Sequence, residues 1–175
     1  LSEAVLALYY LDRAGVRVTC YAPHDIEYPE VNHLTGKNTE KKLNALVESA
    51  RIARGHIKPL NEANAEDLDA LVIPGGYGIA KNLSTYPTDG EHCRVHLGLQ
   101  TLICDMLTGK KPVIAICIAP VLLARMTMHI APGLKLTIGS DPATSRILND
   151  WGEQHVTCSA DDIVIDEMHR VITTP

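Results

Sequence analysis

The chain has 175 residues, with 16 Lys and Arg against 21 Asp and Glu, which gives a formal net charge of -5. This length matches one soluble domain, and a chain of this size can bury a full core without disulfides or a structural metal. Nucleic-acid binding needs clustered Lys and Arg side chains, and these residues form no such cluster, so we expect no nucleic-acid partner. The longest apolar stretch, Pro112 to Ala124, contains two prolines and is too short to span a bilayer. We therefore expect it in the core, and we expect no membrane partner.

The first third of the chain alternates apolar and polar segments. Its pattern predicts, in chain order, a helix from residue 1 to Ala14-Gly15, a buried strand over Val16–Tyr21, a loop or hairpin over 25–38, a helix over 40–54 that starts after Thr39 and ends at Gly55, a short strand over Ile57–Leu60 and a capped helical turn over Asn64–Asp67. We expect a strand to precede the first helix in the complete protein.

The rest of the chain continues the alternation. We predict a central strand over Leu68–Ile73 with a glycine loop, a helix over Glu91–Leu107, a strand over Val113–Ile116, a helix over Ile118–Arg125, a strand over Leu134–Ile138, a helix over Thr144–Trp151, and strands over Ile163–Ile165 and Arg170–Thr173. Strands that alternate with helices form a mostly parallel sheet covered on both faces. The fold class is therefore a doubly wound α/β three-layer sandwich.

Cys117 is the residue most suggestive of chemistry. It directly follows the apolar strand predicted over Val113–Ile116, and a helix starts almost at once after it. This order is typical of the strand-to-helix elbow that holds a nucleophile on a tight turn. A helix N-terminus stabilises negative charge and so favours the reactive thiolate. The alternative is a buried cysteine that packs as a small hydrophobic residue.

A glycine loop forms the second candidate site. Gly75, Gly76 and Gly78 follow the strand that ends at Ile73, where open α/β sheets bind ligands. Their backbone N–H groups are able to form an oxyanion hole, although a simple tight turn has the same composition. Neither a phosphate-binding loop nor a dinucleotide-binding motif is present. We expect Lys81, just beyond the loop, to be solvated.

The remaining candidates are weaker. His92 and His96 are spaced one helical turn apart, but no partner pair at zinc-finger spacing accompanies them, so we expect a solvated helix face and no metal site. His129 is expected on the surface. The five cysteines lack the spacing of a disulfide framework, which favours free thiols in a reducing cytoplasm.

The glycine loop and the cysteine elbow together resemble the PfpI-like superfamily, which shares its fold with class I glutamine amidotransferases. Within it the chain is most similar to the ElbB family, the isoprenoid-biosynthesis glyoxalases also called enhancing-lycopene-biosynthesis proteins. The matching stretches cover the whole chain, and they are Asn32–Gly36, Glu48–Gly55, Pro74–Gly78, Ala80–Ser84, Cys117–Pro120, Leu136–Gly139 and Val171–Pro175.

The resemblance implies roles for particular residues. In this superfamily a glutamate on the helix after the first strand contacts the nucleophile, and Glu3 stands at that position. It implies a protonated Glu3 carboxyl beside the Cys117 thiolate, with backbone N–H groups of Gly75, Gly76 and Ile118 as the oxyanion site. It also implies that residues 1–175 form one PfpI-like domain that lacks its first strand and its C-terminal helix.

The function implied is a cofactor-independent glyoxalase that converts glyoxal, or a similar small dicarbonyl, to glycolate. Hydrolases of the superfamily place a histidine near the cysteine, but Ile118 and Gly139 to Asp141 occupy those positions here. A Cys–His protease is therefore not expected. An amidotransferase-like subunit is a weaker option, because it would need a histidine supplied from elsewhere. The alternative is a non-catalytic, redox-sensing or regulatory member that uses Cys117. We expect a homodimer, located in the cytoplasm, or in mitochondria if the source is a eukaryote.

Overall fold

A computed structural model describes residues 2–175, which divide into two compact units. One unit comprises residues 5–63, and the other comprises residues 2–4 together with 64–175. The first helix, α1 (Ser2–Arg13), starts in the larger unit and continues into the smaller one. Both units mix helices with strand pairs, and most of the pairs across the two units are parallel, so the predicted α/β class is confirmed. Across residues 2–175, no helix has the length and apolar character needed to cross a bilayer.

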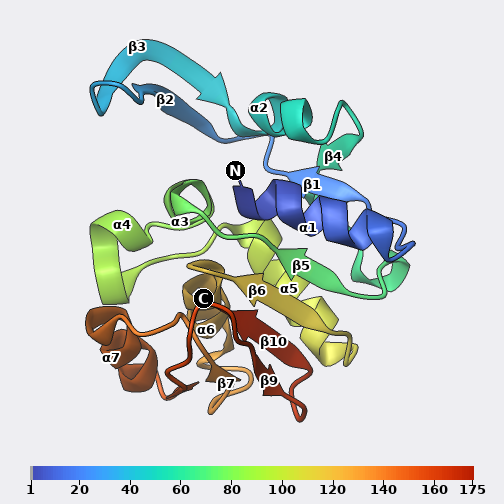
Figure 1. The fold of residues 1–175 in the computed structure, drawn as a ribbon, viewed down its shortest axis with the longest axis vertical. Coiled ribbons are helices and arrows are strands. Elements are labelled where there is room, and N and C mark those ends of the chain that lie inside the picture. The colour runs from blue at the N-terminus through green and yellow to red at the C-terminus, as the bar shows by residue number, and fades with distance from the viewer. Residues whose placement is uncertain (1) are drawn as a thin grey trace. The chain divides into compact units, whose positions relative to one another are not determined.

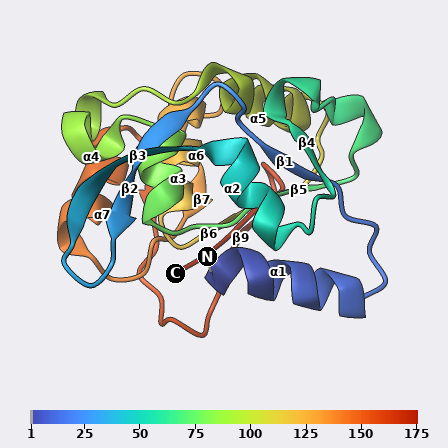
Figure 2. The ribbon, with the colours of Figure 1, turned by 90° about the horizontal axis from the view of Figure 1, so that it is seen from above.

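The smaller unit contains two separate strand pairs and a helix. Strand β1 (Cys20–Ala22) pairs in parallel with β4 (Ile57–Pro59), which is followed by the 3-10 turn η1 (Leu60–Glu62). Strands β2 (Glu27–Asn32) and β3 (Lys37–Asn44) form an antiparallel hairpin, and this ribbon extends away from α2 (Ala45–Ile52) in both views (Figures 1 and 2). Of the loop or hairpin expected over 25–38, the structure has a hairpin, and it extends beyond that range to Asn44.

Two predictions in this unit were wrong in extent. The helix predicted over 40–54 begins only at Ala45, because residues 37–44 pair with β2 instead and the Asn44 side chain caps the helix by accepting a hydrogen bond from Val47 N–H. The strand predicted over Val16–Tyr21 begins only at Cys20. Val16 and Val18 are 49% and 39% exposed, so the β-branched run is not buried as expected.

The larger unit is built on a four-stranded sheet in the order β5-β6-β10-β9. Its strands are β5 (Leu71–Ile73), β6 (Val113–Ile116), β9 (Val164–Asp166) and β10 (Val171–Thr174), and only the β9–β10 pair is antiparallel. Helices α5 (Leu97–Thr108) and α6 (Ala119–Thr127) contact each other and β6, and lie behind the sheet in Figure 1. The sheet and these helices form the core, in which Val113, Ala115 and Val121 are fully buried.

Shorter elements complete this unit. They are the 3-10 turns η2 (Ala65–Asp67) and η3 (Gly90–His92), the helices α3 (Tyr77–Asn82), α4 (Tyr86–Asp89) and α7 (Pro142–Asp150), and the parallel pair β7 (Lys135–Leu136) and β8 (Gln154–His155). The capped turn predicted at Asn64 is η2, in which the Asn64 side chain accepts a hydrogen bond from Glu66 N–H.

Three further predictions need correction in this unit. The strand expected over Leu68–Ile73 starts only at Leu71, because residues 65–68 close a helical turn first. It was expected to be central, but it forms one end of the four-stranded sheet. The helix predicted over Glu91–Leu107 begins at Leu97, because Val95 bridges to Ser84 and the His96 ring accepts from Gly98 N–H as the helix cap. His92 and His96 therefore do not share a helix face. The strand predicted over Leu134–Ile138 is reduced to β7.

Candidate functional site

The turn after β6 has the geometry of a nucleophile elbow. Strand β6 ends at Ile116, Ile118 is the N-cap residue of α6, and Cys117 lies between them with φ 60°. A left-handed conformation costs a residue other than glycine about 1–2 kcal/mol, so the surrounding structure must hold it there. The Cys117 N–H donates a 2.8 Å hydrogen bond to the Thr174 carbonyl at the end of β10. Cys117 is partly exposed, which does not fit the alternative of a buried cysteine that packs as a small hydrophobic residue.

The glycine loop lies directly against this turn. A Cβ atom added at Gly75 would lie 2.6 Å from the Cβ of Cys117, and it would overlap the carbonyl oxygen of Ile116. Real Cβ atoms essentially never approach so closely, so a side chain at Gly75 is incompatible with this packing. Gly76 has φ 96° and forms the N-cap of α3. Tertiary packing therefore brings the loop at 75–76 and the elbow at 117 to the same edge of the sheet.

Three backbone N–H groups at this edge have no acceptor among residues 2–175. They belong to Gly75, Gly76 and Ile118, which are the residues expected to form the oxyanion site. All three residues are partly exposed. Such groups are strong hydrogen-bond donors, and a ligand oxygen is a suitable acceptor for them.

Glu3 lies in the first turn of α1 and is partly exposed. Residues 2–4 cluster with the unit that carries Cys117. A carboxylate in the first turn interacts favourably with the positive end of the helix dipole. The expected contact between the Glu3 carboxyl and the Cys117 sulfur stays a prediction.

The other cysteines have different environments. Burial raises the pKa of the Cys20, Cys93 and Cys104 thiols, with neighbouring charges also acting on Cys93 and Cys104. A raised pKa lowers the fraction of thiolate at neutral pH, so these three thiols are poor nucleophiles. The Cys158 thiol lies 3.4 Å from Thr137 Oγ1. Two side chains expected to be solvated, Lys81 and His129, are exposed.

Sequence patterns did not indicate the support that β10 gives to the elbow. Beside the Thr174 carbonyl, the Thr173 hydroxyl accepts a 2.8 Å hydrogen bond from Thr137 N–H, and the Thr137 hydroxyl accepts one from Gly139 N–H. A Cβ at Gly139 would lie 3.3 Å from Pro175. The Thr174 carbonyl is a backbone group, so the type of side chain at this position does not predict its role. Only the parallel pairing of Thr174 with Ile116 identifies it as the acceptor for Cys117.

Comparison with known proteins places the chain in a family. The model of the DJ-1/PfpI family matches residues 1–174. The mitochondrial ES1 protein homolog of Rattus norvegicus is 34% identical over all of the chain and 68% of the relative's length. The Homo sapiens protein named glutamine amidotransferase-like class 1 domain-containing protein 3, mitochondrial, is 33% identical over the same shares.

Solved structures agree with this assignment. An isoprenoid biosynthesis protein with amidotransferase-like domain from Ehrlichia chaffeensis is 34% identical, with a TM-score of 0.87 over 98% of this chain and 78% of that one. DJ-1beta of Drosophila melanogaster, at 22% identity and a TM-score of 0.58, over 98% of this chain and 73% of that one, shares the fold. The chain therefore belongs to the DJ-1/PfpI family and has its class I glutamine amidotransferase-like fold.

Proposed function

We propose that the protein is a cofactor-independent glyoxalase of the ElbB type, which converts glyoxal or a similar small dicarbonyl to the hydroxy acid. The observation that carries the proposal is the strained conformation of Cys117, with φ 60° at the end of β6 and the glycine loop packed against it. Strain of this kind is retained where the surrounding structure needs the residue in that position. It presents the thiol at the carboxyl edge of the sheet, where open α/β sheets bind ligands.

The proposed reaction begins when the Cys117 thiolate adds to one aldehyde carbon of glyoxal and forms a hemithioacetal. N–H groups of Gly75, Gly76 and Ile118 donate hydrogen bonds to the oxygen that becomes negative. The Glu3 carboxyl gives its proton to this oxygen, and the carboxylate that results removes the proton from the carbon bonded to sulfur and returns it to the second carbon through an enediol. The product is a glycolyl thioester, in which one carbon is oxidised and the other is reduced.

Water completes the cycle. It adds to the thioester carbonyl, the carbon–sulfur bond breaks, and glycolate leaves with the Cys117 thiolate regenerated. One water molecule is consumed per glyoxal, and no external oxidant or reductant is needed. The ElbB assignment is supported by the relative from Ehrlichia chaffeensis, whose name refers to isoprenoid biosynthesis.

We also propose a homodimer in the cytoplasm, or in mitochondria if the source is a eukaryote. The mitochondrial names of the rat and human relatives support the second location.

The test is glycolate formation from glyoxal by the wild type and by Cys117→Ser and Glu3→Gln. Loss of the nucleophile should lower kcat by about 10³-fold or more, and loss of the proton carrier by about 10²-fold or more. Cys104→Ser is the matched control, because Cys104 lies in α5 outside the proposed site, and its activity should stay unchanged.

Undiminished turnover in Cys117→Ser or in Glu3→Gln would refute the mechanism. Selective oxidation of Cys117 to sulfenic acid by mild peroxide, with no glycolate formed by the wild type, would instead favour the redox-sensing alternative.

A further inference from the structure

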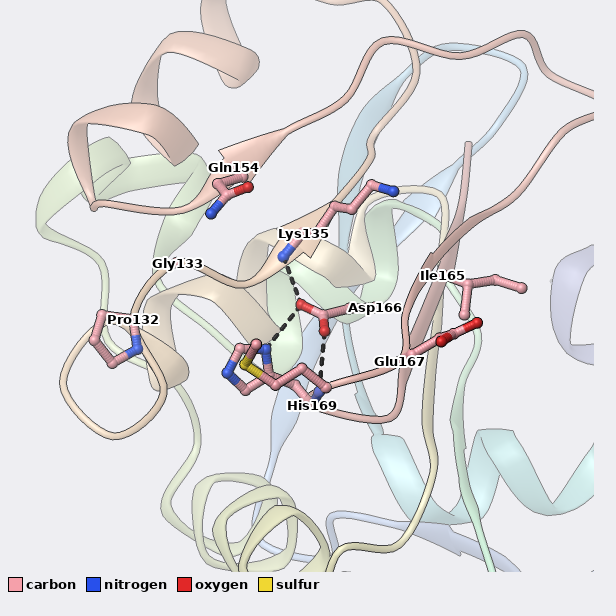
Figure 3. A pocket seen from close by; sticks show the side chains of 9 residues that line it. Pro132, Gly133, Lys135, Gln154, Ile165, Asp166, Glu167 and His169 are labelled. Atoms are coloured by element: carbon pink, nitrogen blue, oxygen red, sulfur yellow. Dashed lines mark hydrogen bonds and ion pairs between the residues drawn. The ribbon is translucent and has the colours of Figure 1, made fainter.

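The segment that starts with β7 is attached to the four-stranded sheet through side chains. The Lys135 N–H donates a 2.8 Å hydrogen bond to the Asp166 carboxylate of β9, and His169 contacts the same carboxylate with its own N–H at 3.0 Å and its Nδ1 at 2.8 Å (Figure 3). Two residues further along, the Thr137 N–H donates a 2.8 Å hydrogen bond to the Thr173 hydroxyl of β10. N–H groups two residues apart in an extended segment point to the same side, so both donors face the sheet.

Thr137 also holds the turn that follows β7. Its hydroxyl oxygen accepts a 2.9 Å hydrogen bond from the Gly139 N–H, and the Cys158 thiol lies 3.4 Å from the same oxygen. Thr137 is completely buried, and Gly139 is buried with φ 93°, in the left-handed region. A buried N–H group is nearly always paired, so the Thr137 hydroxyl is the group that keeps Gly139 in this conformation.

The turn at Gly139 packs against the peptide group that contacts Cys117. A Cβ built at Gly139 would lie 3.3 Å from Cβ and 3.6 Å from Cγ of Pro175, so the glycine backbone lies directly beside the proline ring. The Thr174 carbonyl belongs to the planar peptide group that joins Thr174 to the ring nitrogen of Pro175. This carbonyl accepts the 2.8 Å hydrogen bond from the Cys117 N–H. The position of the proline ring therefore influences the direction of the carbonyl.

The two sides of this peptide group are held by different contacts. On the β10 side, Thr174 pairs with Ile116, and the Thr174 hydroxyl donates a 2.9 Å hydrogen bond to the Asp162 carbonyl. On the other side, the Gly139 backbone lies against the Pro175 ring. Movement of the turn at Gly139 would therefore release one side of the peptide group while β10 stays paired.

We propose that Thr137 is a positioning residue for Cys117. Its hydroxyl fixes the turn at Gly139, and the turn fixes the Pro175 ring. The Thr174 carbonyl is thereby held where it accepts from the Cys117 N–H. Without the hydroxyl, the buried Gly139 N–H loses its acceptor, and the turn shifts toward another one. The left-handed conformation of Cys117 then loses part of its support. The proposal rests on Cys117 as the reactive residue of the proposed function, but not on the identity of the substrate.

The test measures amide hydrogen exchange in ¹⁵N-labelled protein. The amide of Cys117 is compared with that of Val113, at the other end of β6, which donates to the Arg170 carbonyl. Thr137→Val replaces the hydroxyl by a methyl group and should speed exchange at Cys117 by about fivefold or more relative to Val113. Thr137→Ser keeps the hydroxyl and should restore the wild-type ratio. A loss of overall stability alone would speed exchange of both amides equally.

The second readout is the rate at which iodoacetamide alkylates Cys117, followed by peptide mass spectrometry. Thr137→Val should lower this rate by about two- to fivefold, the range over which a helix N-terminus favours a negative charge. Thr127→Val is the matched control, because Thr127 is also completely buried and its hydroxyl donates to Glu153 at 2.8 Å. This control should lose stability, but its Cys117 exchange ratio and alkylation rate should stay unchanged.

Thr173→Val serves if Thr137→Val fails to fold, because it removes the hydroxyl that accepts from the Thr137 N–H, and the same results are expected. Equal changes at Cys117 and Val113, an unchanged or faster alkylation rate, or no recovery in Thr137→Ser would overturn the proposal. Neither readout requires turnover. A wild type that forms no glycolate would therefore refute the glyoxalase activity and leave this test valid.

Discussion

Replacing Gly75 by Ala tests the contact between the glycine loop and the elbow. The added Cβ would lie 2.6 Å from the Cβ of Cys117, whereas ordinary van der Waals contact begins at 3.4 Å, so the two backbones must separate by about 0.8 Å, the difference between these distances. Atoms of the backbone and of a Cβ have no flexible side chain that is able to move aside. The strain must therefore be taken up by the loop, by the elbow or by both.

The expected cost follows from this overlap. Overpacking of this kind costs about 1–3 kcal/mol, and for a chain of this length each kcal/mol lowers Tm by about 2–4 °C. We therefore expect Gly75→Ala to unfold about 2–12 °C below the wild type. A displacement approaching 1 Å at the nucleophile should also lower glycolate formation by about 10²-fold.

The assay combines thermal unfolding, glycolate formation and the rate at which iodoacetamide alkylates Cys117, followed by peptide mass spectrometry. Gly78→Ala is the matched control, since its Cβ would meet only the Asn82 side chain at 4.0 Å and alanine favours a helix. Its Tm should equal or exceed that of the wild type. A Gly75→Ala protein with wild-type Tm and an unchanged alkylation rate would refute the reasoning.

Two further predictions concern strain and burial. Cys117→Gly should be more stable than Cys117→Ala by about 0.5–1 kcal/mol in urea unfolding, because only glycine adopts φ 60° without strain; equal stabilities would contradict this. Burial raises the pKa of Glu153, and hydrogen bonds from Thr127 and Leu134 oppose the rise only in part. The stability that Glu153 contributes is then complete below the unfolded pKa of about 4.3 and is lost as the pH rises through the folded pKa. The wild type should therefore lose stability relative to Glu153→Gln as the pH rises above about 4.3, and a difference that stays constant with pH would show that Glu153 is not responsible.

Sequence alone determined the elements whose signals are local. The four apolar residues of β6 and the cap at Asn64 were predicted to the residue, because strand formation and capping there depend on neighbouring side chains. The same holds for the order of strand, cysteine and helix around Cys117. The composition of residues 37–44 did not reveal a strand, since their pairing with β2 is decided by a partner elsewhere in the chain.

Tertiary structure decided what surrounds the cysteine. Gly75 and Cys117 are far apart in the sequence, and only the parallel pairing of β5 with β6 brings the loop against the elbow. The acceptor for Cys117 N–H is a backbone carbonyl at Thr174, which any residue could supply. The left-handed φ of Cys117 likewise has no sequence signature, because packing imposes it against the preference of the residue. The local pattern thus predicted Cys117 as the candidate nucleophile, and contacts between distant segments determined how this residue is held.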